Sequence, residues 1–301
     1  MEPALDGVEV VLHGGVANVG AVVRVGDHVL RPSNPHTADI HRFLTDLRDA
    51  GFDGVPRPVG VDPDGRERLE YVEGDVALPP FPGWFQEPEA LASVARLLAR
   101  FHAASADLDL SGLEWSSEMV DPAVSELPAE RAAEGAVPAG VVVCHNDVCP
   151  ENVVFRNGEA VALLDFDFAA PGRPVHDLSQ FVRMCVPVAD DEYAESLGFA
   201  PGDRAVAVRA VCDAYDDAGG ELGPEGRQAM LDLLDRSIAR SGEWVRAKAE
   251  AGHPGFIEMW ASVGGQETYD RRRRWWSEER HRFAAAQIGR ASCRERVCSV
   301  V

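Results

Sequence analysis

The sequence predicts an α+β fold of two lobes, with a small β-rich lobe first and a larger helical lobe after it. Residues 1–73 alternate short β-branched runs with glycine turns around one amphipathic helix. A connector rich in proline and glycine follows, and beyond it apolar residues recur mainly at helical spacing. We therefore expect lobes of 1–73 and 74–287, with a cleft at their joint, where small-molecule sites tend to lie.

The first lobe contains five segments with the composition of strands and one with that of a helix. The strand candidates are Val8–Leu12, Ala21–Val25, His28–Arg31, Val59–Val61 and Arg68–Val72. Gly26-Asp27 makes a two-residue turn between the second and third of them, which is typical of a hairpin. Thr37 is the expected N-cap of a helix that Gly51 closes, because apolar residues between them recur on one face.

The second lobe is expected to be mainly helical. The helix candidates are Glu89–Ala104, His176–Val186, Arg204–Ala218, Pro224–Ala251 and Pro254–Ala286. Residues 105–139 are poorly periodic and rich in serine, proline and glutamate, so we expect a loop with short helices there.

The bulk composition is that of a folded protein without a membrane segment. Hydrophobic residues make up 46% of the 301 residues, and no apolar run is long enough to span a bilayer. The N-terminus shows no secretory signal and the six cysteines form no CxxC pair, so we expect a cytoplasmic monomer or homodimer with reduced thiols. The net charge of −21 opposes binding to nucleic acid, and it either suits a cationic substrate or serves solubility.

The final segment, residues 288–301, differs abruptly from what precedes it. IGRASCRERVCSVV follows a helix rich in alanine, glutamate and arginine, and it looks like a translated sequencing-library adaptor. Such a segment is left out of fold reasoning, which leaves the true C-terminus of the native protein open. The alternative is a genuine basic tail.

The most informative segment is VVVCHNDVCPENVVFRNGEAVALLDFDF, residues 141–168. Its first apolar strand delivers Asp147 into a loop that ends at Asn152. Two further strands flank Asn157-Gly158, which is among the strongest hairpin turns readable from a sequence. This hairpin brings Asn152 opposite residues 163–165, so Asn152 and Asp165 share one of its ends, close to Asp147.

These three side chains fit the chemistry of magnesium-assisted phosphoryl transfer. Mg²⁺ prefers hard oxygen ligands, which Asn152 and Asp165 supply. Phosphoryl transfer needs in-line positioning, charge neutralisation and a carboxylate that orients the attacking hydroxyl, which is a task for Asp147. Two other interpretations stay open. The three side chains are ordinary turn residues, or Asp167 competes with Asp165, with which it shares a strand face.

Two motifs in this segment resemble a known family. HNDVCPEN, residues 145–152, resembles the H-x-D-x-x-x-x-N catalytic loop of protein kinases and, with its proline, looks closer to the aminoglycoside phosphotransferase-like family. LLDFDFAAPGRPVHDLS resembles that family's metal-binding segment with its downstream Asp-Leu. The resemblance covers roughly residues 10–285 and implies a protein-kinase-like fold. It also implies that Asp147 is the catalytic base, that Asn152 and Asp165 bind Mg²⁺, and that Asp177 braces the catalytic loop.

His145 precedes the expected base by two residues. A zinc site built from Cys144, His145 and Cys149 is disfavoured, because a fourth ligand and CxxC spacing are absent. We therefore expect His145 to order the catalytic loop.

Glycines and a hinge-like segment are the expected nucleotide contacts of the first lobe. Gly14, Gly15 and Asn18 are expected to cover the phosphates, since glycine lets backbone N–H groups approach anionic oxygens. A plain strand connector is the alternative. The segment around Glu70 and Val72 resembles the kinase hinge, which implies that its backbone binds the adenine edge.

The lobe also departs from the kinase pattern. Protein kinases carry a lysine on the third strand that pairs with a helical glutamate. Here Arg31 occupies the strand position and is able to grip phosphate. His41 lies near the place of the helical acid, and Asp39 is a fallback partner.

The sequence thus predicts a kinase that transfers the γ-phosphoryl group of ATP or GTP to a hydroxyl of a small molecule, with Mg²⁺ as cofactor. The acidic helical lobe favours a polyamine-like or aminoglycoside-like acceptor, while sugars, choline-like alcohols and homoserine-like acceptors stay open. Six acidic residues are candidates for lining a cationic-substrate pocket, with solvated surface residues as the alternative; they are Asp190, Asp191, Glu192, Asp213, Asp216 and Asp217. The alternatives are a catalytically impaired nucleotide-binding module and a metal-dependent hydrolase with His145 and Asp147 as ligands.

Overall fold

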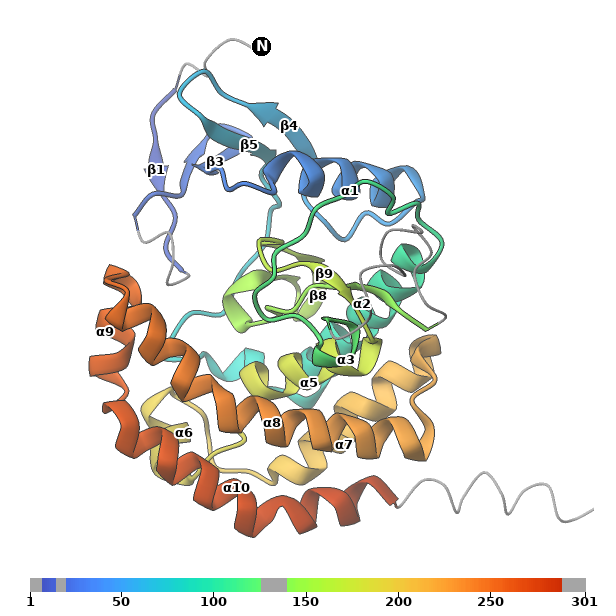
Figure 1. Cartoon of the computed structure of the whole chain (residues 1–301), viewed down its shortest axis with the longest axis vertical. Coiled ribbons are helices and arrows are strands. Elements are labelled where there is room, and N and C mark those ends of the chain that lie inside the picture. The colour runs from blue at the N-terminus through green and yellow to red at the C-terminus, as the bar shows by residue number, and fades with distance from the viewer. Residues whose placement is uncertain (1–6, 15–19, 126–139, 289–301) are drawn as a thin grey trace, which may run out of the picture.

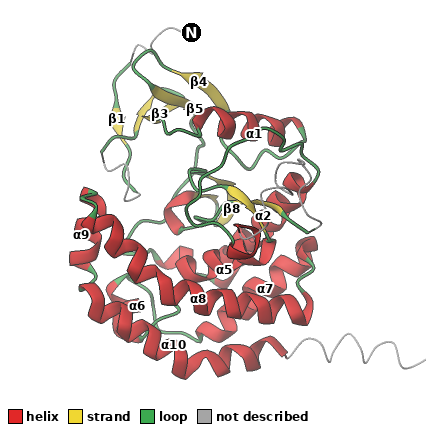
Figure 2. Cartoon of the chain, in the orientation of Figure 1, coloured by secondary structure: helices red, strands yellow, loops and turns green. Residues whose placement is uncertain are grey.

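The computed structural model describes residues 7–14, 20–125 and 140–288. A β-rich lobe lies over a larger helical lobe, which makes the protein a two-lobed α+β fold (Figure 1). The strands gather in the upper lobe and at the centre, and the lower lobe consists mainly of helices joined by loops (Figure 2). None of the described helices combines the length and the apolar character that crossing a bilayer requires.

The first lobe is an antiparallel sheet with one helix beside it. The strand order is β1-β2-β3-β5-β4. The strands are β1 (Val10–Val11), β2 (Val23–Val25), β3 (His28–Pro32), β4 (Pro58–Val61) and β5 (Arg66–Glu70), and the helix is α1 (Thr37–Asp49). Arg31 on β3 stands directly opposite Glu67 on β5 in the register of the sheet. This register makes Glu67 an ion-pair partner of Arg31.

The connector between the lobes is fixed to the second lobe by a backbone bridge. Asp75 donates to the Phe155 carbonyl at 2.9 Å and accepts from the Phe155 N–H at 2.8 Å. Gly74 has a φ of 146°, and a Cβ built on it would lie 2.5 Å from the Phe155 carbonyl oxygen. Only glycine fits here, because the conformation and the close approach of two backbones both exclude a side chain.

The second lobe packs its helices around two short β-ribbons. Its helices are α2 (Pro88–Ala106), α3 (Pro122–Ser125), α5 (Pro174–Cys185), α6 (Asp191–Ser196), α7 (Arg204–Tyr215), α8 (Gly223–Glu250), α9 (Pro254–Ser262) and α10 (Gly265–Ile288). Its strands are β6 (Val142–Cys144), β7 (Val153–Arg156), β8 (Glu159–Leu163) and β9 (Ala170–Gly172), with β6 paired to β9 and β7 paired to β8. Single turns of other helix types span Gly83–Gln86, Pro150–Asn152 and Asp216–Gly220.

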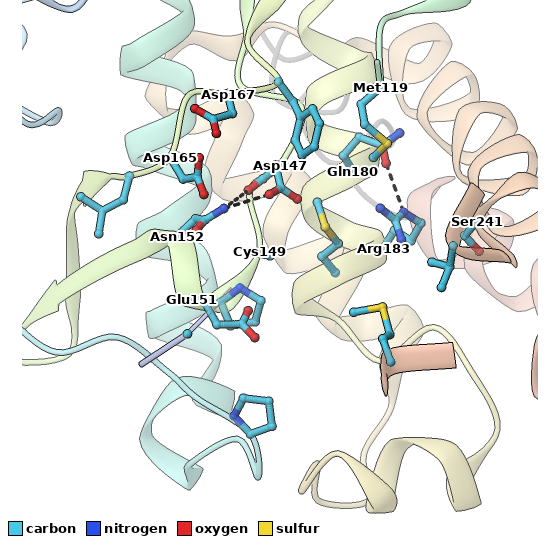
Figure 3. Close-up of a pocket in the computed structure, with 18 of the residues that line it drawn as sticks. Met119, Asp147, Cys149, Glu151, Asn152, Asp165, Asp167, Gln180, Arg183 and Ser241 are labelled. Carbon is cyan, nitrogen blue, oxygen red and sulfur yellow. Dashed lines mark hydrogen bonds between the residues drawn. The ribbon is translucent and has the colours of Figure 1, made fainter. Parts of the chain in front are cut away.

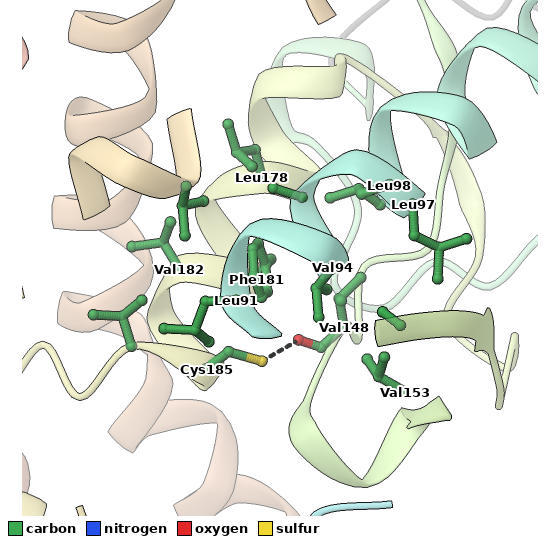
Figure 4. Packing of buried hydrophobic residues seen from close by; sticks show 14 of the residues in the cluster. Leu91, Val94, Leu97, Leu98, Val148, Val153, Leu178, Phe181, Val182 and Cys185 are labelled. Carbon is green, nitrogen blue, oxygen red and sulfur yellow. Dashed lines mark hydrogen bonds between the residues drawn. The ribbon is translucent and has the colours of Figure 1, made fainter. Parts of the chain in front are cut away.

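The core of this lobe supports the loop that follows β6. Apolar residues of α2 and α5 interdigitate beneath the loop, with Leu98 and Phe181 fully buried (Figure 4). Val148 of the loop belongs to the same cluster, and its carbonyl accepts from the Cys185 thiol. The loop therefore rests on a packed surface that cannot shift without opening a cavity.

Most predicted elements are present, and the hairpin around Asn157-Gly158 is confirmed, with both turn residues at positive φ. Two local predictions were wrong. Thr37 is the first residue of α1 and not its N-cap, and its hydroxyl accepts the Asn34 N–H instead. The predicted helix over Pro254–Ala286 is broken at Gly264-Gly265, both at positive φ, so α9 and α10 are separate. The short helix α6 was not predicted.

Replacing Gly74 with alanine tests the connector. We expect Gly74→Ala to lower the free energy of unfolding by about 1–3 kcal/mol more than Gly65→Ala does, because the new methyl group collides with the Phe155 backbone. Gly65 is the matched control, since it also has positive φ but faces open space. Urea denaturation measures both. Equal losses would show that the backbone contact does not constrain the connector.

Candidate active site

The loop after β6 is held by one buried carboxylate. Asp177, in the first turn of α5, accepts the backbone N–H of His145 at 2.7 Å and that of Asn146 at 2.8 Å. It also contacts His102 Nε2 of α2 at 3.0 Å. These contacts hold the pKa of Asp177 below its usual range although burial alone would raise it. Asp177 thus fixes the path of the chain immediately before Asp147.

His145 lies fully buried beneath this loop. Its Nε2 lies 2.8 Å from the Leu164 carbonyl, and its Nδ1 accepts the Asp147 N–H at 3.2 Å. Burial lowers the pKa of His145, which favours the neutral ring with one donor and one acceptor that these partners require. Because both nitrogens are used within the protein, His145 has no atom left to bind a metal ion.

One other cluster in the described part of the chain has the composition of a metal site. Ligand atoms of His102, Cys144 and Asp177 lie within 4.8 Å of one another. His102 uses both of its nitrogens, one toward Asp177 and one toward the Tyr215 hydroxyl at 2.7 Å. Burial raises the pKa of Cys144 well above its usual value, so it stays a thiol. This cluster is a hydrogen-bonded support of the loop.

Asn152 and Asp147 meet across the loop. Asn152 Nδ2 donates to Asp147 Oδ2 and to the Asp147 carbonyl, each at 3.0 Å (Figure 3). The Asn152 carbonyl accepts from the Leu164 N–H at 2.8 Å, as the hairpin register predicts. The amide nitrogen of Asn152 is therefore directed at Asp147, and its side-chain oxygen is left for another partner. Figure 3 shows Asp165 and Asp167 beside this pair.

The environment of Asp147 disfavours its charged form. Burial raises the pKa of Asp147 to about 7, and the neighbouring Asp165 adds to the effect. Arg183 and the Asn152 hydrogen bond act in the opposite direction. Asp147 is consequently a carboxylate that accepts a proton near neutral pH.

Arg31 joins the two lobes through three carboxylates. Its Nη1 lies 2.9 Å from Asp165 Oδ1, its Nη2 contacts Asp167, and its Nε lies 2.6 Å from Glu67 Oε1. Burial would raise the pKa of Asp165, but the adjacent Arg31 guanidinium holds it below its usual range. Burial and the Asp165 charge raise the pKa of Asp167 to about 6. The pair of aspartates thus carries more negative charge than Arg31 neutralises.

Glu67 on β5 is the acidic partner of Arg31, which the sequence analysis expected in the region of α1. Its second oxygen, Oε2, lies 2.8 Å from His41 Nε2 on α1. The helix therefore contacts Arg31 indirectly, through Glu67. The expectation that Asp39 is a fallback partner of Arg31 was wrong. Sequence reasoning missed Glu67 because it did not pair the third and fifth strands, on which Arg31 and Glu67 face each other.

These groups line one continuous cavity of about 1510 Å³ between the lobes. Gly14, Glu70 and Val72 line its upper part, so the predicted hinge segment borders the cavity. Gly15 and Asn18 lie outside the described residues. Apolar side chains line much of the upper walls; they include Leu12, Val22, Val29, Leu69, Val154 and Leu164. Asp147, Asn152, Asp165 and Asp167 border the same space.

The donor set fits a hard divalent cation. The side-chain oxygen of Asn152 and the carboxylates of Asp165 and Asp167 are oxygen ligands of the type that Mg²⁺ takes. Asp165 uses one oxygen for Arg31, and its other oxygen accepts no hydrogen bond from the described side chains. The negative charge of the aspartate pair that Arg31 does not neutralise favours the binding of a cation.

The fold has an antiparallel sheet lobe over a helical lobe, and the loop with Asp147 and the hairpin end with Asp165 and Asp167 lie at their junction. This arrangement is that of a phosphotransferase of protein-kinase-like fold. The chain belongs to the phosphotransferase enzyme family, whose family model matches residues 11–215. It is similar to the trifolitoxin immunity protein of Rhizobium leguminosarum bv. trifolii, with 30% identity over 210 residues that cover 69% of this chain and 74% of that protein.

Solved structures share the fold at lower identity. The choline/ethanolamine kinase family protein of Mesorhizobium loti has a TM-score of 0.56 at 20% identity, with 92% of this chain and 93% of that chain covered. The choline kinase of Cryptosporidium parvum Iowa II gives 0.56 at 12% identity, with 95% and 92% covered. The macrolide 2'-phosphotransferase of Brachybacterium faecium gives 0.51 at 17% identity, with 80% and 87% covered. These likenesses support the fold alone.

Replacing Arg31 with lysine tests the three-way ion pair. We expect Arg31→Lys to cost about 1–3 kcal/mol of unfolding free energy, because one ammonium group cannot reach three carboxylates that a guanidinium fork serves. Arg42→Lys is the control, since Arg42 makes an exposed pair with Asp46 at 3.6 Å and an exposed hydrogen bond to the Ser111 carbonyl at 3.2 Å. Thermal denaturation compares them. Equal stability of the two variants would contradict the proposed importance of the fork.

The raised pKa values of Asp147 and Asp167 predict how stability depends on pH. Both carboxyls bind protons more tightly in the folded state than in the unfolded chain, so their protonation stabilises the fold. This stabilisation is complete below about pH 4 and is lost as the pH rises through about 6 for Asp167 and about 7 for Asp147. Each contributes a slope of at most about 1.4 kcal/mol per pH unit. Asp165 has a lowered pKa, so its contribution to stability has the opposite sign: it is lost as the pH falls, and only in more acidic solution.

We therefore expect the metal-free protein to unfold more easily at pH 8 than at pH 5. Asp147→Asn should flatten this dependence, while Asp107→Asn, an exposed carboxylate beyond the end of α2, should leave it unchanged. Denaturation in the presence of a chelator, followed from pH 5 to pH 8, measures the slope. A slope that Asp147→Asn does not alter would mean that Asp147 is not the group responsible.

Proposed function

We propose that this protein is a small-molecule kinase that moves the γ-phosphoryl group of ATP or GTP to a substrate hydroxyl. The observation that carries the proposal is the meeting of Asp147, Asn152 and Asp165 on the wall of one cavity. Phosphoryl transfer is mainly a matter of positioning and charge neutralisation. A carboxylate, an amide oxygen and an acidic pair next to a buried arginine are suited to both tasks.

The upper part of the cavity suits a nucleotide. Its apolar walls fit the faces of a base, and among the described residues no group bonds to the backbone of Val72, which leaves that backbone for a base edge. Arg31 lies at the inner end of this space, next to the aspartates. Gly14, at a φ of 128°, borders the cavity and keeps it open to a phosphate chain.

Asn152 and Asp165 would hold the magnesium ion, with Asp167 as a further donor beside them. When bound, the ion supplies charge neutralisation for the phosphate oxygens. Arg31 orients Asp165 for this role through its hydrogen bond. The excess negative charge of the Asp165–Asp167 pair is the part of the structure that supports this assignment.

Asp147 would orient the acceptor hydroxyl and take its proton. Asn152 and the Asp177 clamp fix the position of Asp147 in the loop, and one of its carboxylate oxygens faces the cavity without a partner among the described residues. A base whose pKa lies near the working pH transfers protons efficiently. The value of about 7 for Asp147 meets this condition.

Two other functions receive less support. An impaired nucleotide-binding module was motivated by the missing helical glutamate, but Glu67 supplies Arg31 with a carboxylate partner. A hydrolase with His145 as a metal ligand is disfavoured, since both nitrogens of His145 are engaged. The acceptor itself is either aminoglycoside-like or another metabolite. The relative named for immunity to a toxin makes an antimicrobial compound one candidate.

Replacing Asp147 with asparagine tests the proposed chemistry. We expect wild type to transfer the γ-phosphoryl group in the presence of Mg²⁺ and to be stabilised thermally by Mg·ATP or Mg·GTP. Asp147→Asn should reduce kcat on the order of 10²–10⁴-fold and keep the thermal shift, because the nucleotide contacts are intact. Asp107→Asn serves as the control. The proposal would be refuted if the wild type did not bind nucleotide, or if Asp147→Asn kept the turnover of the wild type.

A further inference from the structure

The end of the cavity away from the nucleotide is cationic at its depth. It is formed by α5, α8, α9 and α10, and two arginines face it from inside, Arg183 on α5 and Arg272 on α10. The other charged residues that these helices contribute lie exposed at the rim; they are Arg236, Arg240, Glu243 and Glu258. The deep part therefore holds two positive charges, of which Arg183 acts directly on Asp147.

Arg272 is buried without a carboxylate partner in the described part of the chain. Its side chain is 7% exposed, and its Nε makes no hydrogen bond to any described residue. Its guanidinium carbon lies 4.6 Å from the centre of the Tyr193 ring and 5.9 Å from that of Tyr269. By contrast, Arg271, next to it on the same helix, forms ion pairs with Asp190 and Glu192.

Arg183 is in a similar position. Its Nε donates to Gln180 Oε1 at 3.1 Å, a neutral group, and no carboxylate of the described residues pairs with it. Figure 3 shows it projecting from α5 toward the space beside Ser241, with Asp147 between it and Asp165. Burial lowers the pKa of Arg183, and the Arg272 charge lowers it further, while Asp147 counteracts both.

Two neighbouring guanidinium groups, one buried at Arg272 and one partly buried at Arg183, are costly unless an anion joins them. Protein carboxylates do not fill this role in the described structure. The acidic residues that sequence analysis offered as pocket groups do not either. Asp190 and Glu192 pair with Arg271, Asp191 with Arg204, and Asp213 and Asp216 with Arg227. None of these five, nor Asp217, lines the cavity.

We propose that the phosphoryl acceptor carries an anionic group, a carboxylate or a phosphate, which binds between Arg183 and Arg272 while the acceptor hydroxyl reaches Asp147. This inference rests on the phosphotransferase function proposed above. Guanidinium forks match the oxygen pairs of both anions. Apolar and aromatic side chains make up much of the remaining wall and suit the carbon skeleton of such an acceptor; they include Met119, Met184, Trp244, Phe256 and Met259.

Matched sets of hydroxyl compounds test the charge preference. We would assay ω-hydroxyalkanoates of increasing length, the corresponding primary amides, amino alcohols and ω-hydroxyalkyl phosphates as acceptors with Mg·ATP. We expect one of the two anionic sets to exceed the amides and amino alcohols of equal length by about tenfold or more in kcat/KM. The comparison of the two anionic sets identifies the anion. Amides or amino alcohols that equal or exceed both anionic sets would overturn the inference.

Arg183→Gln and Arg272→Gln show whether these arginines cause the preference. Each should raise KM for the preferred anion more than for its amide, whereas Arg271→Gln, whose partners are outside the cavity, should not. Each should also keep or raise the melting temperature of the ligand-free protein, since it removes one of two like charges. If Arg272 only packs against the tyrosines, Arg272→Gln lowers the melting temperature and leaves the preference unchanged, which contradicts the proposal.

The two proposals fail in distinguishable ways. Wild type that shows no thermal shift with Mg·ATP or Mg·GTP contradicts the phosphotransferase function itself. Wild type that binds nucleotide and phosphorylates neutral or cationic hydroxyl compounds in preference to anionic ones keeps that function and contradicts only the anionic acceptor.

Discussion

The site depends on one buried guanidinium that faces three carboxylates. Arg31 comes from the β-rich lobe, where it pairs with Glu67, and it reaches Asp165 and Asp167 on the hairpin of the helical lobe. The contact joins the lobes at the wall of the cavity. One positive charge against three negative ones leaves an excess of negative charge in a partly dry environment, which is unfavourable until a cation arrives. This excess of negative charge is the basis of the proposed cation site.

The rest of the helical lobe holds the loop that faces this cluster. Asp177 accepts two consecutive backbone N–H groups and a histidine, and the loop rests on packed residues of α2 and α5. Asn152 then orients Asp147 by a direct hydrogen bond. Each of these groups is fixed by a partner. In the proposed reaction Asp147 would therefore meet a substrate with little reorganisation, and preorganisation of this kind is a main source of catalytic power.

Local sequence signals predicted the parts of the site that lie close together in the chain. Asn157-Gly158 specifies a tight turn, so the sequence alone places Asn152 next to Leu164 and Asp165. Contacts between strands and helices distant in sequence were less readable. Glu67 was missed because strand order decides its neighbour, and Arg272 because its helix was predicted to continue from Pro254 through Gly264 and Gly265. The acidic residues offered as pocket groups do not line the cavity for a similar reason: the net charge of −21 describes the whole chain and does not say which charges face a cavity.

The most direct test of this account is a crystal structure with Mg²⁺ and a non-hydrolysable ATP analogue. The account predicts a metal ion bound by Asn152 Oδ1 and Asp165, a base in the apolar upper part of the cavity, and a γ-phosphate that faces Asp147. A nucleotide bound elsewhere, or a metal ion that does not contact Asn152 and Asp165, would contradict it.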